Sequence, residues 1–158
     1  IKHCDPLKIP YQKNKFDALF CYGVIFCTNW KKLINEFKRV LKPNGKLYLN
    51  ANDIGWYVYL WEKERNKSFD YIPRKTVVKS FENTLKFNLD NNYLPKSGHI
   101  IIKKTDLIDY LKKSSFANIE FGKEGTINKN RKIEHKSFFK GSYKGMDCVY
   151  EIIARKGI

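Results

Sequence analysis

FDALFCYGVIFCTNWKKLINEFKRVLKPNGKLYLNAN, residues 16–52, is the stretch that decides the fold. Its early part, 17–22, is a short, unbroken apolar run, as expected for a strand covered on both faces in a parallel sheet. Apolar side chains then recur at helical spacing from Trp30 to Leu41, and a second apolar strand follows at 47–51. This order of strand, helix and strand predicts a βαβ unit with a right-handed crossover.

The ends of the predicted helix carry clear signals. Thr28 or Asn29 can cap its first turn, because both side chains accept hydrogen bonds from free backbone amides. Residues 43–45, Pro-Asn-Gly, are typical of the point where a helix stops and the chain reverses. We therefore expect the strands at 17–22 and 47–51 to lie side by side and parallel.

Further elements follow in the second half of the chain. Residues 76–87 have the spacing of a helix, and its inward side is expected to carry Val77, Val78, Phe81 and Leu85. A second helix is predicted over 106–113 with Thr105 as its cap, and strands are predicted at 119–121 and 149–154. The long loop between these strands, 122–147, leaves the carboxyl end of a strand, so it should hang over the ligand face.

Three linked segments carry a family resemblance. Phe16-Asp17, the Arg-Val-Leu-Lys-Pro-Asn-Gly run at 39–45 and the Cys-Asp-Pro-Leu-Lys-Ile-Pro-Tyr run at 4–11 resemble, in order and distance, the second half of class I S-adenosylmethionine-dependent methyltransferases. The resemblance implies an α/β, Rossmann-like sheet of parallel strands with one antiparallel strand near the C-terminus. It also implies that the strands at 17–22, 47–51, 149–154 and 119–121 are neighbours in that order.

The resemblance covers only part of such an enzyme. No glycine-rich GxGxG turn occurs in the sequence, and the chain starts with Ile inside a strand pattern. We therefore interpret residues 1–158 as a partial methyltransferase domain whose N-terminal strands are missing. The strand at 17–22 would then present a bare apolar edge, which a missing N-terminal half, a second copy or a partner chain must cover. Residues 54–98 are interpreted as a helical insertion that forms a lid and binds the acceptor.

The resemblance also implies where S-adenosylmethionine would bind. In the family, the segment matched by Asp5, Pro6 and Leu7 lies near the adenine, although Pro6 offers no backbone N–H. The residues after the strand at 17–22 run beside the methionine part of the cofactor; here they are Cys21, Tyr22 and Gly23. The alternative interpretation is that Asp5 only caps a turn and that the other side chains only fill the core.

The acceptor side is assigned from topology. Asn52 and Asp53 end the second strand, and the aromatic cluster that begins with Trp56 and Tyr57 follows at once. Loops that leave the carboxyl ends of strands line the ligand crevice in such sheets. We therefore expect these four residues to contact the acceptor. A small satellite core is the alternative for the aromatic residues.

Two histidines are candidate general bases, because an imidazole titrates near neutral pH and can remove a proton from a hydroxyl or an amine. They are His99, at the end of the insertion, and His135, in the 122–147 loop. Either histidine is also compatible with a plain surface position. The same loop carries cations that could bind a phosphate-bearing acceptor or simply be solvated: Lys129, Arg131, Lys132, Lys136 and Lys140.

Composition limits the remaining possibilities. The chain is globular, with 42% hydrophobic residues, and it has no apolar run long enough for a membrane span. Its formal net charge of +15 permits a nucleic-acid partner, but nearly all of that charge is lysine, as in sequences from AT-rich genomes. The four cysteines show no metal-binding spacing, so we expect no metal site, buried thiols at Cys21 and Cys148, and a reducing cytoplasm.

Three functions are compatible with these observations. The first is methyl transfer from S-adenosylmethionine to a small-molecule acceptor, such as a sugar, a nucleotide-linked sugar or a lipid precursor. This chain would be the acceptor-side half and inactive on its own. The second is a catalytically inactive, methyltransferase-like binding subunit. The third is an RNA methyltransferase or RNA-binding module, suggested by the charge and by the aromatic residues of the 122–147 loop.

Overall fold

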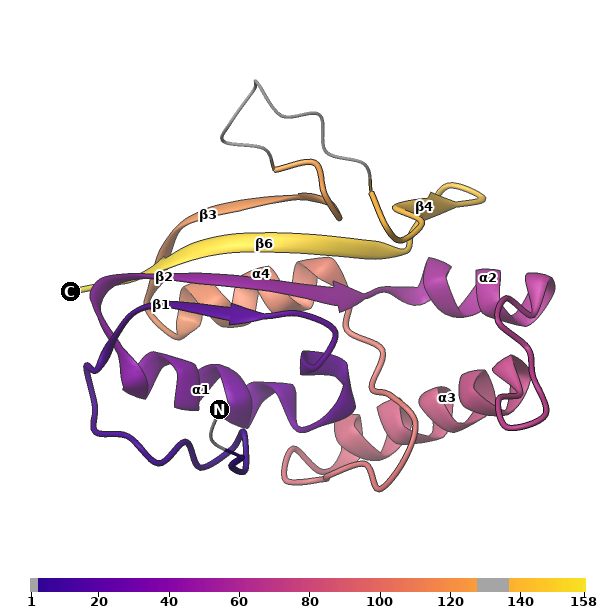
Figure 1. The fold of residues 1–158 in the computed structure, drawn as a ribbon, viewed down its shortest axis with the longest axis horizontal. Coiled ribbons are helices and arrows are strands. Elements are labelled where there is room, and N and C mark those ends of the chain that lie inside the picture. The colour runs from indigo at the N-terminus through magenta and orange to yellow at the C-terminus, as the bar shows by residue number, and fades with distance from the viewer. Residues whose placement is uncertain (1–2, 128–136) are drawn as a thin grey trace.

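The βαβ unit predicted from the sequence is present in the computed structural model, which describes residues 3–127 and 137–158. It consists of strand β1 (Phe16–Cys21), helix α1 (Trp30–Val40) and strand β2 (Leu41–Asn52), with a short 3-10 turn η1 (Ile25–Cys27) before the helix. The two strands are parallel neighbours, and Leu19 pairs with Leu47 (Figure 1). The prediction on which the other assignments depend is therefore confirmed.

The ends of α1 follow the sequence signals with one difference. Of the two candidate caps, Asn29 is the one used, because its Oδ1 accepts a hydrogen bond from the Lys32 amide at 3.0 Å. The Pro-Asn-Gly segment does not separate the helix from the strand, since β2 begins at Leu41. Residues 42–45 instead form an irregularity inside β2, where Asn44 has a positive φ of 61°.

The main sheet has the order β1-β2-β6-β3. Strand β6 (Val149–Lys156) pairs antiparallel with β2 on one side and with β3 (Phe116–Lys123) on the other. Strands β1, β2 and β3 therefore share one direction and β6 opposes them, which confirms the expected fold class and strand order. A separate hairpin consists of β4 (Ser142–Tyr143) and β5 (Met146–Asp147).

Helices cover one face of this sheet (Figure 1). Helix α1 and helix α4 (Lys104–Lys113) contribute buried side chains to the same hydrophobic core as β2 and β6. The fully buried members of that core include Leu33, Ile34, Leu47, Leu49, Leu107, Leu111 and Ile152. Beyond the carboxyl end of β2, helices α2 (Ile54–Lys63) and α3 (Pro73–Leu89) form a second, smaller cluster with the start of β6.

The expectation that β1 is covered on both faces is wrong. Ala18 and Phe20 are exposed, and 73% of the surface of Phe20 is open to solvent. The reason is topological: β1 lies at the edge of the sheet, and among the described residues no helix packs on the face that carries Phe20. The predicted bare edge is thereby confirmed. The chain was interpreted as starting inside a strand pattern, but residues 3–5, the first described residues, have no strand structure.

Two details of the helices also differ from expectation. Val77 is buried as expected, but Val78, Phe81 and Leu85 of α3 are exposed. The buried face of α3 instead contains Ser80, Asn83 and Phe87, so its inward side is rotated relative to the apolar pattern. Thr105 does not cap α4, whose first turn is held by a carboxylate from another part of the chain, the side chain of Asp53.

Candidate functional site at the carboxyl edge of the sheet

The carboxyl ends of β1 and β2 lie next to each other and leave space beside Gly23. Its φ of +72° suits glycine, and a Cβ at this position would meet no atom within 4 Å. The Gly23 amide donates a 2.7 Å hydrogen bond to Oδ1 of Asn50, which joins the turn after β1 to the end of β2. Cys21, just before this turn, is buried in the core, and burial raises the pKa of its thiol to about 11. Backbone and shape, rather than a thiolate, are what this turn offers a ligand.

Asp53 connects the end of β2 to two helices. Its Oδ1 accepts a 2.6 Å hydrogen bond from the Ile54 amide at the start of α2, and its Oδ2 accepts one of 2.8 Å from the Lys104 amide at the start of α4. Carboxylates at helix N-termini satisfy free amides and complement the helix dipole. Asp53 is buried, as is Asn52 before it. The carboxylate predicted to touch an acceptor therefore also holds the α2 and α4 N-termini together.

Phe139 joins two of the predicted ligand-binding regions. Its ring lies 6.3 Å from the ring of Tyr22, on the cofactor side, and 5.6 Å from the ring of Trp56, on the acceptor side. Phe139 belongs to the 122–147 segment, whose described part lies at the carboxyl edge as expected, because the Val149 amide donates to the carbonyl of Lys140. Tyr22, Phe139 and Trp56 thus form one aromatic wall.

One buried glutamate, Glu124, supports this wall, and a second, Glu151, holds Tyr48 of β2. Oε1 of Glu124 accepts a 2.8 Å hydrogen bond from the Tyr22 hydroxyl, and its Oε2 accepts the amides of Phe138 and Phe139. Glu151 in β6 accepts the Tyr48 hydroxyl at 2.8 Å. Burial, followed by these carboxylate contacts, raises the pKa of Tyr22 to about 12 and raises that of Tyr48 further. Both tyrosines therefore stay protonated and donate to the glutamates at neutral pH.

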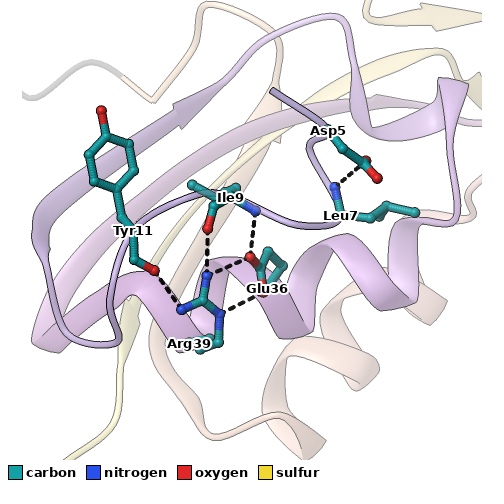
Figure 2. A network of polar contacts seen from close by, with 6 residues as sticks. All are labelled: Asp5, Leu7, Ile9, Tyr11, Glu36 and Arg39. Atoms are coloured by element: carbon teal, nitrogen blue, oxygen red, sulfur yellow. Dashed lines mark hydrogen bonds and ion pairs between the residues drawn. The ribbon is translucent and has the colours of Figure 1, made fainter. Parts of the chain in front are cut away.

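The segment that carries Asp5 is fixed to α1 through Arg39 (Figure 2). The Arg39 guanidinium donates to the carbonyls of Ile9 at 2.8 Å and Tyr11 at 2.7 Å, and it forms an ion pair with Glu36 at 2.7 Å. Glu36 in turn accepts the Ile9 amide at 2.7 Å. The arginine of the Arg-Val-Leu-Lys-Pro run is thus a clamp between helix and loop.

Asp5 itself closes a turn. Its Oδ1 accepts a 2.9 Å hydrogen bond from the Leu7 amide, with Pro6 between them (Figure 2). The side chain of Asp5 is exposed, whereas that of Leu7 packs partly against the main core. Turn formation and contact with a ligand are compatible for an exposed carboxylate, which keeps a second oxygen.

His99 lies between the two hydrophobic clusters. Its ring is 4.6 Å from that of Phe26 and 6.0 Å from that of Tyr57. Its Nδ1 is buried without a hydrogen-bond partner among residues 3–127 and 137–158, and burial lowers its pKa. The Tyr57 hydroxyl is completely buried and makes no close hydrogen bond in this part of the chain, and its polar neighbours are the side chains of Asn52 and Ser80. These two buried polar atoms, Nδ1 of His99 and the hydroxyl oxygen of Tyr57, lie near the carboxyl edge of the sheet.

His135 and the cations Lys129, Arg131, Lys132 and Lys136 are outside the described residues. Lys140 is described, and its ammonium lies over the rings of Tyr59 and Tyr143 at 5.5 and 5.7 Å. The cysteines are free, with Cys21 and Cys148 buried as predicted. Within the described ranges, no helix is both long and apolar enough to cross a membrane.

Sequence reasoning missed the two glutamates and the clamp. Glu151 interrupts an otherwise apolar strand. Because a buried charge needs a hydrogen-bond or ion-pair partner, this position could have been recognised from the sequence as part of a polar network. Glu124 and Arg39 offered no such signal, because the groups that they hold, the Tyr22 hydroxyl for Glu124 and the Tyr11 carbonyl for Arg39, lie far away in the sequence. Of the predicted site residues, the structure brings Tyr22, Gly23, Asn52, Asp53 and Trp56 to the same edge.

Part of the chain is similar to known methyltransferases. Residues 1–49 match a family described as a methyltransferase domain. Across 72 residues the chain is 35% identical to a probable tRNA methyltransferase 9B from Mus musculus; this alignment includes 42% of the chain and 14% of that relative.

Solved structures agree with the sequence match. An S-adenosylmethionine-dependent methyltransferase from Methanosarcina mazei superposes with a TM-score of 0.54 at 16% identity, over 99% of this chain and 66% of that one. A methyltransferase from Thermotoga maritima, described as a possible histamine N-methyltransferase, superposes with a TM-score of 0.55 at 17% identity. This superposition covers 96% of this chain and 61% of that one. The fold is that of class I S-adenosylmethionine-dependent methyltransferases, and the resemblance expected from the sequence is confirmed. Both of these solved structures are described as S-adenosylmethionine-dependent methyltransferases.

Proposed function

We propose that this chain supplies the acceptor side of an S-adenosylmethionine-dependent methyltransferase that acts on a small molecule, such as a sugar, a nucleotide-linked sugar or a lipid precursor. The observation that carries the proposal is the position of Phe139, whose ring contacts both Tyr22 and Trp56. These two residues were assigned independently to the cofactor and to the acceptor. A shared wall would hold donor and acceptor in line, and positioning alone supplies a large part of the rate acceleration in such a displacement.

The residues present fit one side of a cofactor site. The open space at Gly23 would let an extended ligand pass along the end of β1, and the Arg39 clamp presents the Asp5 turn. When bound, S-adenosylmethionine supplies a methyl group made electrophilic by its sulfonium sulfur. The chain's own contribution would be the aromatic wall, which excludes water, and the Asp5–Leu7 turn, which would contact the adenine.

His99 and Tyr57 are proposed to serve the acceptor. As the acceptor's oxygen or nitrogen forms its bond to the methyl carbon, the carbon–sulfur bond breaks and the acceptor must lose a proton. The unpartnered Nδ1 of His99 is a suitable proton acceptor, because the lowered pKa keeps the imidazole neutral at pH 7. The buried Tyr57 hydroxyl would donate a hydrogen bond to the same substrate.

The insertion at 54–98 and the exposed edge of β1 also have proposed roles. We propose that the insertion at 54–98 acts as the lid over the acceptor. We also propose that another segment or chain covers the β1 edge, where the solvent-exposed ring of Phe20 stacks on that of Tyr48. The free thiols suit a reducing compartment such as the cytoplasm.

The test of this function compares two matched glycines. Gly23 and Gly145 both have positive φ, and a Cβ at either position would meet no atom within 4 Å, but Gly145 lies in the turn of the β4–β5 hairpin and not in the turn after β1. S-adenosylmethionine should raise the melting temperature of the protein, expressed from its full reading frame. Gly23→Ala should abolish this shift, whereas Gly145→Ala should leave it intact. If the wild type shows no shift, the proposed function is wrong; a shift without methyl transfer to any acceptor would favour the inactive binding subunit.

A second candidate is methyl transfer to RNA. It is favoured by the similarity to a probable tRNA methyltransferase and by the net charge of +15. Radiolabelled methyl incorporation into bulk tRNA, compared with a small-molecule extract freed of RNA, distinguishes the two acceptor classes.

A further inference from the structure

The surface between α2 and α3 is apolar and open. A groove of about 450 Å³ lies there, lined by Tyr57, Val58, Trp61, Val77, Val78, Phe81, Glu82 and Leu85. Apart from Glu82, every lining residue is apolar or aromatic. Trp61 remains 44% exposed and Leu85 64% exposed. Side chains of this size are rarely left in water as a contiguous patch unless something covers them.

The exposed face of α3 extends the groove into a long stripe. Val78, Phe81, Leu85 and Leu89 are all exposed and follow one another at spacings of three or four residues. This is the spacing at which one helix receives the side chains of another, and the stripe is about 17 Å long at 1.5 Å per residue. The buried face of α3, with Ser80, Asn83 and Phe87, points the other way. Helix α3 is therefore apolar on a face that the described residues leave uncovered.

Charge identifies the kind of helix that fits. Lys75, Lys79 and Lys86 follow one flank of the stripe, and Arg74 lies at its start. Among the described residues, Lys79 is paired with Glu82 at 3.0 Å and Arg74 lies 3.8 Å from Glu64, whereas Lys75 has no ion-pair partner. A second copy of this chain would bring its own lysines to the seam, and its net charge of +15 adds to the repulsion. The complementary partner is acidic.

We propose that the α2–α3 groove binds an amphipathic helix whose apolar face is flanked by acidic residues. A small ligand fits less well, because small-molecule sites need several convergent polar groups and the groove offers only Glu82. A flat membrane surface would not fill a concave groove. Helix-in-groove recognition uses anchors at the spacing seen on α3. The proposal does not depend on the methyl-transfer function.

Two designed peptides test it. Both are 18 residues long with leucine at every heptad a and d position; one has glutamate and the other lysine at the flanking positions. By fluorescence anisotropy, the full-length protein should bind the glutamate peptide at least about tenfold more tightly than the lysine peptide, a difference that a few complementary flank charges supply. The double variant Phe81→Asp, Leu85→Asp should lose this binding. Phe69→Asp, at a fully exposed position in the loop between the helices, is the matched control and should retain it.

Charge reversal completes the experiment. Lys75→Glu combined with Lys86→Glu should invert the preference, so that the lysine peptide binds more tightly. Circular dichroism checks that each variant remains folded. Equal binding of the two peptides, or no binding of either, would overturn the proposal. Retention by vesicles of anionic phospholipid that is lost in the Phe81→Asp, Leu85→Asp variant, without peptide binding, would show a membrane-binding face instead.

Discussion

Arg39 shows how one side chain can organise a loop that has no regular structure. It forms hydrogen bonds to two carbonyls and to the Glu36 carboxylate, and no other residue type offers this number of donors in a planar array. Glu36 completes the arrangement by accepting the Ile9 amide. The loop from residue 5 to residue 11 therefore depends on two side chains from α1.

Arg39→Lys should loosen this loop without unfolding the protein. A lysine ammonium cannot reach both carbonyls and both carboxylate oxygens, so the Ile9 amide should exchange its hydrogen about tenfold faster or more. Hydrogen–deuterium exchange measures the effect. Lys38→Ala, which removes the neighbouring cation on the same helix, is the control and should leave the Ile9 amide unchanged. An equally slow Ile9 amide in Arg39→Lys would contradict the clamp.

His99 should make stability depend on pH. Burial lowers its pKa below the ordinary value of 6.5, so below that pH the unfolded chain binds a proton that the folded protein does not. The free energy of unfolding should therefore fall as pH drops from 7 through 6.5, and level off once the folded-state pKa is passed. His99→Gln should flatten this region of the curve in urea denaturation, whereas His3→Gln, at an exposed position, should not. An unchanged slope in His99→Gln would exclude His99 as the cause.

At the scale of elements, α2 passes unusually close to the β4–β5 hairpin. A Cβ on Gly55 would lie 2.5 Å from the Asp147 carbonyl oxygen and 2.8 Å from that of Met146. In an ordinary helix, replacing glycine by alanine stabilises the protein by about 0.5–1 kcal/mol. Gly55→Ala should instead lower the free energy of unfolding by about 1–3 kcal/mol, because backbone must move. Lys63→Ala in the same helix is the control, and a more stable Gly55→Ala protein would refute the close approach.

Asp53 should be the most sensitive polar residue at the junction of α2 and α4. Asp53→Ala removes the caps of two helices at once and should lower the free energy of unfolding by about 1–3 kcal/mol. The free energy of unfolding of Asp53→Asn should lie between those of Asp53→Ala and the wild type, because the asparagine amide keeps only one acceptor oxygen. Urea denaturation measures both, with the exposed Asp70→Ala as control. An Asp53→Ala protein as stable as the wild type would show that water replaces the carboxylate.

The elements that the sequence predicted well are those with strong periodicity and clear end signals. The strand at β1, helix α1 and strand β2 were predicted from apolar spacing and the Asn29 cap, whereas the Pro-Asn-Gly segment turned out to lie inside β2. The errors came from interactions that span long stretches of sequence. Periodicity could not reveal that Asp53 caps α4 in place of Thr105, nor which apolar face of α3 would be buried, because both depend on how distant segments pack.

At the scale of the whole molecule, the net charge of +15 predicts weak, non-specific RNA binding. Because such binding releases counterions, the affinity for tRNA should fall by at least about tenfold between 50 and 200 mM salt. Filter binding should show the same affinity for tRNA and for an unrelated RNA of equal length. Binding that persists at 200 mM salt with a preference for tRNA would instead favour RNA as the methyl acceptor.

The position of Phe139 between Tyr22 and Trp56 has a thermodynamic consequence. If the donor and the acceptor each press on one side of this ring, neither can bind without changing the surface that the other meets. Their affinities must then be linked, and linkage is reciprocal: the factor by which the acceptor changes the dissociation constant of the donor equals the factor by which the donor changes that of the acceptor. Phe139→Ala should bring that common factor towards one.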